Sequence, residues 1–323
     1  MAEGKKRLLT GLQPSGQLHI GNYLGALKPF ADTAPEYDAM LMIADYHALT
    51  SLKNPTQLRE NIIDVVADYV AAGINPADVV IFKQSDVMQH TELAWIFECL
   101  VTVPFLSQAH AYKDKVAKGL EANAGLFNYP MLMAADILLY DSEFVPVGED
   151  QRQHIEYSRE AANKFNVAYG QTFAEPKELI MSHVGQVPGT DGKKMSKSYG
   201  NTIPLFGTDD VIRTAVMSIK TDSTAVGAPL NPETDITFAL HKHFSPNIKE
   251  LEQRYREGTI GYKKSKEILA ENIIATISPM REKRAALSRE AVIQILKDGA
   301  EVARTRAEEK MKIVREKVGV GLY

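Results

Sequence analysis

The sequence contains very little cysteine and no long hydrophobic run. Its 323 residues include a single cysteine, Cys99, which excludes a four-thiolate zinc or iron–sulfur site. Because Cys99 stands in an apolar stretch, we expect a reduced thiol in the core of a cytoplasmic protein. No apolar run approaches the length of a bilayer span, so no membrane segment is expected. Internal repeats and low-complexity tracts are also absent, and the composition agrees with an ordinary soluble enzyme.

Two familiar nucleotide-binding motifs are missing from the N-terminal region. The apolar run Leu8 to Leu12 leads into a turn rich in Gly, Pro and Ser and then into a periodic apolar stretch. This order is typical of a phosphate site at the start of a helix. Gly11 and Gly16 have the spacing of a P-loop, but the following Lys and Ser or Thr are absent, as is Gly-x-Gly-x-x-Gly. His19 and Asn22 are the polar groups left to meet a ligand, although such a histidine is more often a surface or capping residue.

The most informative segment that is present is a basic loop, defined here as Gly192 to Gly200. It holds three lysines and two serines around one methionine. Lysine ammonium groups offset phosphate charge, and serine hydroxyls and backbone amides donate hydrogen bonds. The bounding glycines leave the backbone free to move. The segment therefore predicts a loop that closes over a polyphosphate, although charge alone would equally suit a solvated surface loop.

One isolated charge stands out in the middle of the chain. The segment Met131 to Tyr140 is apolar almost all round, which indicates a buried helix, and Asp136 is its only charged residue. A buried carboxylate must find a donor. Either a protein group such as an Arg or a Ser pairs with Asp136, which is the commoner case, or a ligand does.

Alternating strand and helix patterns predict an α/β fold. The clearest helix begins at Asn54-Pro55 and ends at Gly73. Such alternation implies a doubly wound parallel sheet with ligands at the carboxyl ends of its strands. Short apolar strands are expected at Arg7 to Leu12, Ala39 to Ala44, Val79 to Lys83 and Phe144 to Val147.

After Pro204 the strand signals fade, and the pattern from Asp209 onward predicts a smaller all-helical domain. The net charge of the chain is −4, yet residues 281–323 are basic. A basic helical face in this tail would contact phosphates, although interleaved acidic residues suit a solvated helix equally well. Its members are Arg304, Arg306, Lys310, Lys312, Arg315 and Lys317. Breaks between helices are expected at Asn231-Pro232, Ser245-Pro246, Gly258 to Gly261 and Ser278-Pro279.

Two of these segments resemble the signature motifs of class I aminoacyl-tRNA synthetases. His19-Ile20-Gly21-Asn22 is similar to the HIGH motif, with Asn22 in the form found in tryptophanyl-tRNA synthetases of the bacterial type. Lys194 to Ser198 spells the KMSKS motif. The resemblance runs over nearly the whole chain. Further segments that match this family are Gln13-Pro14-Ser15-Gly16, Met133 to Tyr140 and Val145 to Gln151.

This resemblance implies a Rossmann-like catalytic domain over residues 1–204, with an inserted helical dimerisation segment at about 88–140. A helical tRNA anticodon-binding domain over 205–323 would follow, with a last helix able to pack back on the catalytic domain. The helices between Trp95 and Leu126 would form the dimer interface, although their residues suit a core equally well.

The same resemblance implies a cytoplasmic homodimer, with no membrane association, that activates L-tryptophan with ATP and transfers it to tRNA(Trp). Mg²⁺ is expected to bind mainly through the ATP phosphates. Asp150 and His154 have the i, i+4 spacing of a metal pair, but no further ligands converge, so no protein metal site is expected. The alternatives are a tyrosine–tRNA ligase of the same subclass and a catalytically inactive tRNA-binding paralogue.

For the nucleotide, the resemblance implies a site in which Lys194, Lys197, Lys115, His19 and Gln13 take part in catalysis. Lys115 would otherwise be an exposed helical lysine, and the acidic pair at 149–150 suits the start of any helix. The implied ATP-binding residues are Gln13, Pro14, Ser15, His19, Gly21, Asn22, Gly148, Glu149, Asp150, Val187, Lys194, Met195, Ser196, Lys197 and Ser198.

For the amino acid, the resemblance implies that Asp136 accepts the indole N–H of tryptophan. Indole offers one donor and no acceptor, so a carboxylate suits it. The apolar members of the pocket would otherwise be ordinary core residues. The other implied tryptophan-binding residues are Leu9, Gly11, His47, Tyr129, Met133, Val145, Val147 and Gln151.

Overall fold

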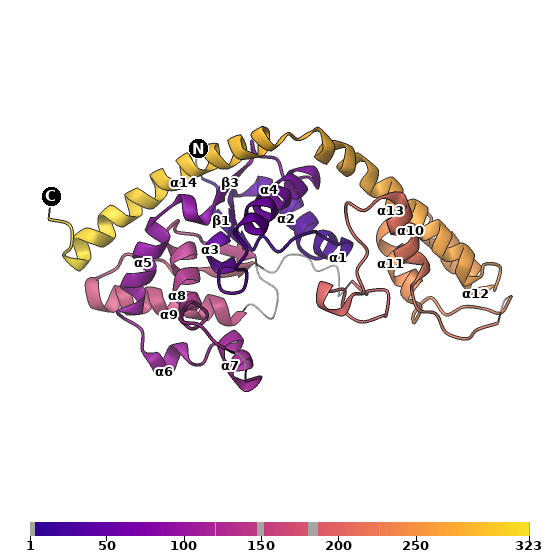
Figure 1. Cartoon of the computed structure of the whole chain (residues 1–323), viewed down its shortest axis with the longest axis horizontal. Coiled ribbons are helices and arrows are strands. Elements are labelled where there is room, and N and C mark those ends of the chain that lie inside the picture. Colours follow the sequence, from indigo (N-terminus) through magenta and orange to yellow (C-terminus); the bar gives the residue numbers. More distant parts are fainter. Residues whose placement is uncertain (1–3, 120, 147–151, 180–186, 226, 323) are drawn as a thin grey trace.

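A parallel β-sheet lies at the centre of the N-terminal part of the chain (Figure 1). The computed structural model describes residues 4–119, 121–146, 152–179, 187–225 and 227–322. Neighbouring strands pair in parallel in the order β3-β2-β1-β4-β5. The strands are β1 (Arg7–Leu12), β2 (Asp38–Ile43), β3 (Val79–Lys83), β4 (Phe144–Pro146) and β5 (Lys177–Leu179).

Both faces of this sheet are buried, as a doubly wound fold requires. Along β2, Leu41 and Ile43 belong to one hydrophobic cluster, whereas Met40 and Met42 belong to another. This alternation follows from the two-residue period of a strand. The first face is covered by α2 (Lys28–Thr33) and α4 (Pro55–Ala71), and the second by α5 (Gln89–Glu98), α8 (Ala124–Leu138) and α9 (Arg152–Tyr169). The predicted α/β class is therefore confirmed.

Local sequence signals set most of the element boundaries. The side chain of Asn54 accepts hydrogen bonds from the backbone N–H groups of Thr56 and Gln57, both at 3.1 Å, and Pro55 is the first residue of α4. This is the predicted N-cap. Among the strands of the described residues, β5 is the one that the sequence did not predict. It is a three-residue edge strand of sequence Lys-Glu-Leu, too short and too polar to show an apolar pattern.

The C-terminal part is helical, as expected. One predicted break is wrong: Pro279 lies inside α13, which continues without interruption to Ala286. A proline removes one backbone hydrogen bond from a helix. Here Ile274 and Ile277 are buried in the hydrophobic core on the same helix, and this packing keeps it continuous. The helices are α10 (Asp209–Met217), α11 (Ile236–Phe244), α12 (Ile248–Arg256), α13 (Tyr262–Ala286) and α14 (Arg289–Val318).

The last helix, α14, returns from this helical part and lies along strand β3 (Figure 1). A side chain at Gly299 would place its Cβ 1.9 Å from the carbonyl oxygen of Ile81. Only glycine therefore allows this approach of helix to strand. Ala303, Ala307 and Met311 on the same helix are fully buried among the residues of the second face of the sheet.

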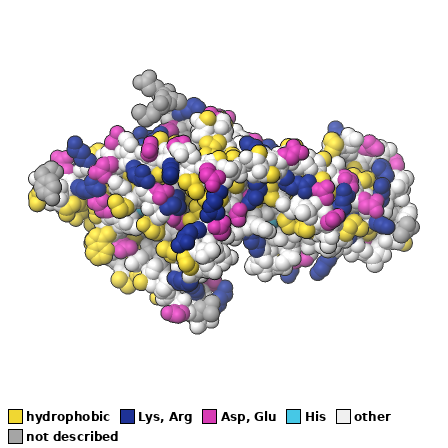
Figure 2. Space-filling model, turned by 45° about the horizontal axis from the view of Figure 1, so that its top comes forward, with side chains coloured by type: hydrophobic (Ala, Val, Ile, Leu, Met, Phe, Trp, Pro, Cys, Tyr) yellow, Lys and Arg dark blue, Asp and Glu magenta, His cyan; other side chains and the backbone are white. Residues whose placement is uncertain are grey.

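Basic side chains of α14 mostly make contacts within the protein. Five of the six predicted residues have intramolecular partners, although Arg304, Lys312 and Lys317 are exposed on the helix. Figure 2 shows acidic and basic side chains intermixed on this side of the molecule. The contacts are Arg304 with the carbonyl of Asp86 (2.8 Å), Arg306 with Asp38 (3.0 Å), Lys310 with Asp141 (2.6 Å), Arg315 with Glu92 (2.7 Å) and Lys317 with the carbonyl of Gln171 (3.2 Å).

The predicted core position of Cys99 is wrong. α5 buries Leu93 and Phe97 on one side, while Cys99 lies at its C-terminal end and is exposed. Trp95, in the same apolar stretch, is 67% exposed. The stretch is apolar on both sides of the helix, so composition alone could not distinguish the buried face. Among the described residues, no helix combines the length and the hydrophobicity needed to cross a membrane.

Candidate active site

A cavity of about 570 Å³ opens at the carboxyl ends of the strands, where a doubly wound sheet places its ligands. Its walls come from the end of β1 and the turn that follows it, from the end of β2, and from α8, β4 and the start of α9. The volume lies in the range usual for small-molecule sites.

Asp136 on α8 forms one wall of this cavity and is only 2% exposed. Its Oδ1 accepts a hydrogen bond from Gln84 Nε2 at 2.8 Å, and its Oδ2 lies 2.9 Å from His47 Nε2. His90 Nδ1 is 2.6 Å from Oδ1. Burial alone would raise the pKa of Asp136, but the polar contacts of His47 and His90 outweigh it and lower the pKa to about 2. The group is therefore an ionised, acceptor-only carboxylate.

The expectation that protein groups pair with Asp136 is confirmed, although the partners are two histidines and a glutamine and not an Arg or a Ser. No sequence pattern predicted a role for Gln84, His90 or Tyr140. Gln84 follows the carboxyl end of β3 directly, so its place in the fold could have pointed to the site. His90 is fully buried on α5 and had no comparable signal.

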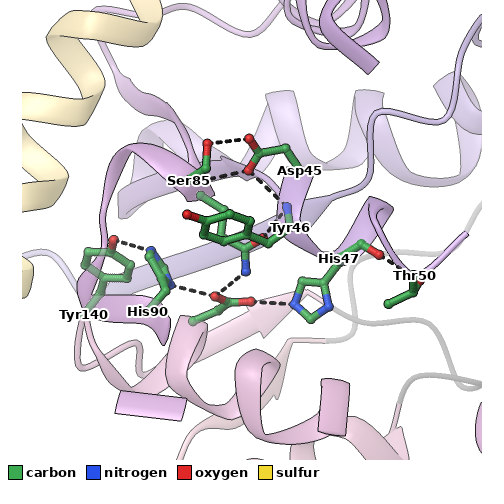
Figure 3. A network of polar contacts seen from close by, with 9 residues as sticks. Asp45, Tyr46, His47, Thr50, Ser85, His90 and Tyr140 are labelled. Carbon is green, nitrogen blue, oxygen red and sulfur yellow. Dashed lines mark hydrogen bonds and ion pairs between the residues drawn. The ribbon is translucent and has the colours of Figure 1, made fainter. Parts of the chain in front are cut away.

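A second carboxylate, Asp45, ties together the two segments that carry His47 and Gln84 (Figure 3). Those segments are α3 (Asp45–Ala48) and the 3₁₀ turn η3 (Gln84–Asp86). Asp45 accepts hydrogen bonds from the backbone N–H of Ser85 at 2.9 Å and from its hydroxyl at 2.5 Å. The backbone N–H of Tyr46 donates to Gln84 Oε1 at 3.1 Å. The Gln84 amide is thus held with its N–H₂ toward Asp136.

Every predicted tryptophan-binding residue in the described part of the chain lines the cavity. Val147 and Gln151 lie outside the described residues. The hydroxyl of Tyr129 is 2.8 Å from His154 Nε2, so both belong to the same wall. No group of three or more potential metal ligands occurs in the described ranges. The lining residues predicted from the sequence are Leu9, Gly11, His47, Tyr129, Met133, Asp136 and Val145.

On the nucleotide side, Gln13, Ser15 and Asn22 line the cavity, whereas His19 does not. His19 caps α1 (Ile20–Asn22). Its ring Nδ1 accepts a hydrogen bond from the backbone N–H of Asn22 at 3.2 Å, and the backbone N–H of His19 donates to Asn22 Oδ1 at 3.1 Å. Burial, helped by the nearby charge of Lys197, lowers the pKa of His19 to about 4. The capping interpretation therefore describes its contacts, and the ring is neutral at pH 7.

The basic loop contacts the turn that follows β1. Lys197 Nζ donates to the carbonyl oxygen of Ser15 at 2.9 Å. Met195 is buried, and a Cβ at Gly21 would lie 3.2 Å from Met195 Cβ. Burial lowers the pKa of Lys197. The loop therefore lies against the predicted HIGH-like segment.

Other predicted nucleotide contacts lie outside the cavity lining. Val187 is buried, and its carbonyl accepts from the N–H of Met195 at 3.1 Å. Lys194 is exposed, and Lys115 is half-buried on α7 (His110–Ala117). The others are Pro14, whose carbonyl accepts from Asn61 at 3.0 Å, and Ser196 and Ser198, whose hydroxyls are 2.9 Å apart. Gly148, Glu149 and Asp150 lie outside the described residues.

Residues 1–287 match the protein family described as tRNA synthetases class I (W and Y). The chain belongs to this family. A tryptophan–tRNA ligase of Fusobacterium nucleatum is 47% identical to this synthetase over 320 residues, 98% of both chains. Among solved structures, the Campylobacter jejuni tryptophanyl-tRNA synthetase complexed with ADP and tryptophan is similar with a TM-score of 0.92. It is 44% identical and covers 97% of this synthetase and 99% of its own chain. The Mycoplasma pneumoniae enzyme has a TM-score of 0.81 at 29% identity, over 98% of both chains.

Proposed function

We propose that this synthetase is a tryptophan–tRNA ligase, in which Asp136 recognises the indole ring. It activates L-tryptophan with ATP, releases pyrophosphate, and transfers the tryptophanyl group to tRNA(Trp). Relatives 38% to 47% identical over nearly its whole length are tryptophan–tRNA ligases, which supports the choice of amino acid. The observation that carries the proposal within the site is the ionised carboxylate of Asp136 in the cavity wall.

The hydrogen-bond capacity of Asp136 supports its role toward indole. A carboxylate has about four acceptor positions. Gln84 and His90 occupy Oδ1, and His47 occupies one position of Oδ2. Of these three partners only His47 lines the cavity, so Oδ2 is the cavity-facing oxygen and keeps one position for a ligand. An acceptor that cannot donate selects a ring with a single N–H donor.

Activation requires no nucleophile from the protein. The tryptophan carboxylate oxygen attacks the α-phosphorus of ATP, the bond from that phosphorus to the bridging oxygen breaks, and pyrophosphate departs with the electron pair. Lys194 and Lys197 offset the charge on the departing phosphates, and Lys115 is a further predicted phosphate contact. Gln13, Ser15 and Asn22 orient the nucleotide in the cavity. His19 acts by capping the segment that carries Asn22, so we assign it a positioning role.

Mg²⁺ would be held at this site mainly by the phosphates of ATP. The described cavity lining offers amide and hydroxyl oxygens from Gln13, Ser15 and Asn22 on the nucleotide side. Mg²⁺ is commonly held by nucleotide phosphates, water and one or two protein ligands. When bound there, it neutralises phosphate charge alongside the lysines.

The tRNA and a second copy of the chain are the proposed macromolecular partners, in the cytoplasm. The helical part beyond residue 204 binds the anticodon in this proposal. The dimer forms through the inserted helices, where Met88, Trp95 and Val103 are all more than 60% exposed. Large apolar side chains at such exposure favour a protein interface. A Trp95→Glu variant that remains dimeric in solution would refute this interface.

Amino-acid-dependent ATP–pyrophosphate exchange tests the proposed activity, with each amino acid supplied in turn. Exchange with tryptophan and none with tyrosine is the expected result. Exchange with tyrosine alone would identify the tyrosine enzyme of the same subclass. A folded sample that exchanges with no amino acid would instead support an inactive tRNA-binding paralogue.

A further inference from the structure

A pair of buried rings stands behind Asp136, on the side away from the cavity. Tyr140 is 1% exposed and His90 is fully buried, and neither lines the cavity. The Tyr140 hydroxyl is 2.8 Å from His90 Nε2, and His90 Nδ1 is 2.6 Å from Asp136 Oδ1 (Figure 3). Phe82 stacks on the His90 ring with centroids 6.2 Å apart and meets the Tyr140 ring edge-on at 5.4 Å. The three rings therefore fix one another in place.

The neighbours of the two ring nitrogens of His90 determine which nitrogen carries the hydrogen. The hydroxyl of Tyr140 stays protonated, because burial and then the charge of Asp136 raise its pKa. Its hydrogen points to His90 Nε2, the one acceptor given to it by the described residues. Nε2 then accepts, and the hydrogen of the neutral ring lies on Nδ1. The short distance from Nδ1 to Oδ1 agrees, because two bare acceptors would repel each other at 2.6 Å.

The contact between His90 Nδ1 and Asp136 Oδ1 does not have the geometry of a well-aligned hydrogen bond. His90 Nδ1 has no aligned hydrogen bond among the described residues, although it lies close to the carboxylate. The contact is therefore electrostatic, and its sign depends on the tautomer. With hydrogen on Nδ1 the ring attracts Oδ1 and keeps it occupied. With hydrogen on Nε2, a lone pair would face the carboxylate and displace it.

We propose that Tyr140 and His90 are positioning residues for tryptophan recognition. Tyr140 selects the Nδ1–H tautomer of His90, and this tautomer holds Oδ1 of Asp136 so that Oδ2 faces the indole N–H in the cavity. The inference rests on the proposed indole contact of Asp136. It adds that the selectivity of the pocket depends on a hydroxyl group that touches neither the substrate nor the carboxylate.

The test compares tryptophan with an analogue in which sulfur replaces the indole N–H, β-(3-benzothienyl)alanine. Both are assayed by ATP–pyrophosphate exchange with the unmodified chain and with Tyr140→Phe. We expect kcat/KM for tryptophan to fall about tenfold in the variant, mainly through KM, as the loss of one buried hydrogen bond produces. The analogue cannot use Asp136, so its kcat/KM should stay unchanged.

Tyr157→Phe is the matched control, because Tyr157 belongs to the same hydrophobic cluster and its hydroxyl bonds to the carbonyl of Phe105 at 3.2 Å, away from Asp136. It should leave the ratio of the two substrates unchanged. An equal fall for both substrates in Tyr140→Phe would show a general structural role and overturn the inference. If the unmodified chain fails to discriminate between the two substrates, the indole contact itself is wrong.

Neutron diffraction from crystals of the unmodified chain gives a second measurement that does not depend on how a variant folds. Deuterium on Nδ1 of His90, with the Tyr140 hydroxyl pointing to Nε2, is the expected result. Deuterium on Nε2 alone would overturn the inference even if Tyr140→Phe weakened tryptophan binding.

Discussion

The two halves of the active site differ in where their polar groups find partners. Around Asp136 the partners are protein groups: Gln84, His47 and His90 surround a carboxylate that is almost fully buried. In the basic loop, Lys194 is exposed and Lys197 bonds to the backbone carbonyl of Ser15. The amino-acid half is thus organised by the protein itself, whereas the nucleotide half presents charge to a ligand. A binding site fixed by protein contacts favours selectivity for the amino acid. Exposed lysines favour neutralisation of the phosphate charge.

The largest effect on tryptophan activation should come from removing Asp136, the carboxylate at the centre of the amino-acid half. Asp136→Ala takes away the indole acceptor and leaves the donors of Gln84, His47 and His90 unpaired. We expect kcat/KM for tryptophan to fall about 10⁴-fold, with the KM for ATP nearly unchanged. Exchange kinetics with each substrate varied will measure this. Unfolding curves are needed alongside, because breaking a buried charged network costs about 3–5 kcal/mol. Unchanged tryptophan affinity in a folded variant would contradict the proposal.

The exposed half should behave differently when a charge is removed from it. Lys197→Ala is expected to slow single-turnover formation of the adenylate about 10²–10³-fold, because a positive charge no longer offsets the departing phosphates. Its free energy of unfolding should change by less than about 0.5 kcal/mol, as for most surface substitutions. Lys193→Ala in the same loop is the control and should retain the rate. A normal rate in Lys197→Ala would remove this lysine from the reaction.

As the pH falls, the stabilisation contributed by the nucleotide half should be lost before that contributed by the amino-acid half. The folded pKa of His19, about 4, lies below its unfolded value of 6.5, so the unfolded chain binds the extra proton first. The free energy of unfolding should therefore fall as pH drops from 6.5 toward 4, by about 2 kcal/mol between pH 7 and pH 5. Asp136 has a folded pKa of about 2 against 3.8, and its stabilisation is lost only as pH falls from 3.8 toward 2.

Urea unfolding of the unmodified chain and of His19→Asn at both pH values isolates this contribution. Asparagine is a good N-cap that does not titrate. The comparison is needed because His241, also with a pKa lowered to about 4 by burial, titrates in the same window. If both proteins lose the same stability between pH 7 and pH 5, His19 does not titrate as described.

The smallest effect should come from the contact between Ser85 and Asp45, which lies farther from the substrate in the amino-acid half. Ser85→Ala removes the hydroxyl bond to Asp45 but leaves the bond from the Ser85 backbone N–H. We expect a loss of about 1 kcal/mol in stability and a rise of a few-fold in the KM for tryptophan. Ser107→Ala is a matched control, because that hydroxyl bonds to the carbonyl of Pro104 on the surface. A KM that rises as much in Ser107→Ala would show that the Asp45 link does not act on the pocket.

How far the sequence could predict this molecule depends on whether a signal was local. The cap at Asn54 and the single charge of Asp136 in an apolar helix are local features, and both are found where they were expected. The partners of Asp136 come from segments about 50 and 90 residues away, His90 among them, and no pattern links them in the sequence. Cys99 was misplaced because hydrophobicity does not say which side of a helix is covered.

The close approach of α14 to β3 at Gly299 has a mechanical consequence for the whole chain. It fixes α14 to the sheet, and only Leu287 and Ser288 separate this helix from α13. Ion pairs from Arg284 and Arg289 to α4 brace both sides of this two-residue corner. The corner thus couples helices α10 to α13 firmly to the sheet, because α13 also packs on α4 and shares a hydrophobic cluster with it.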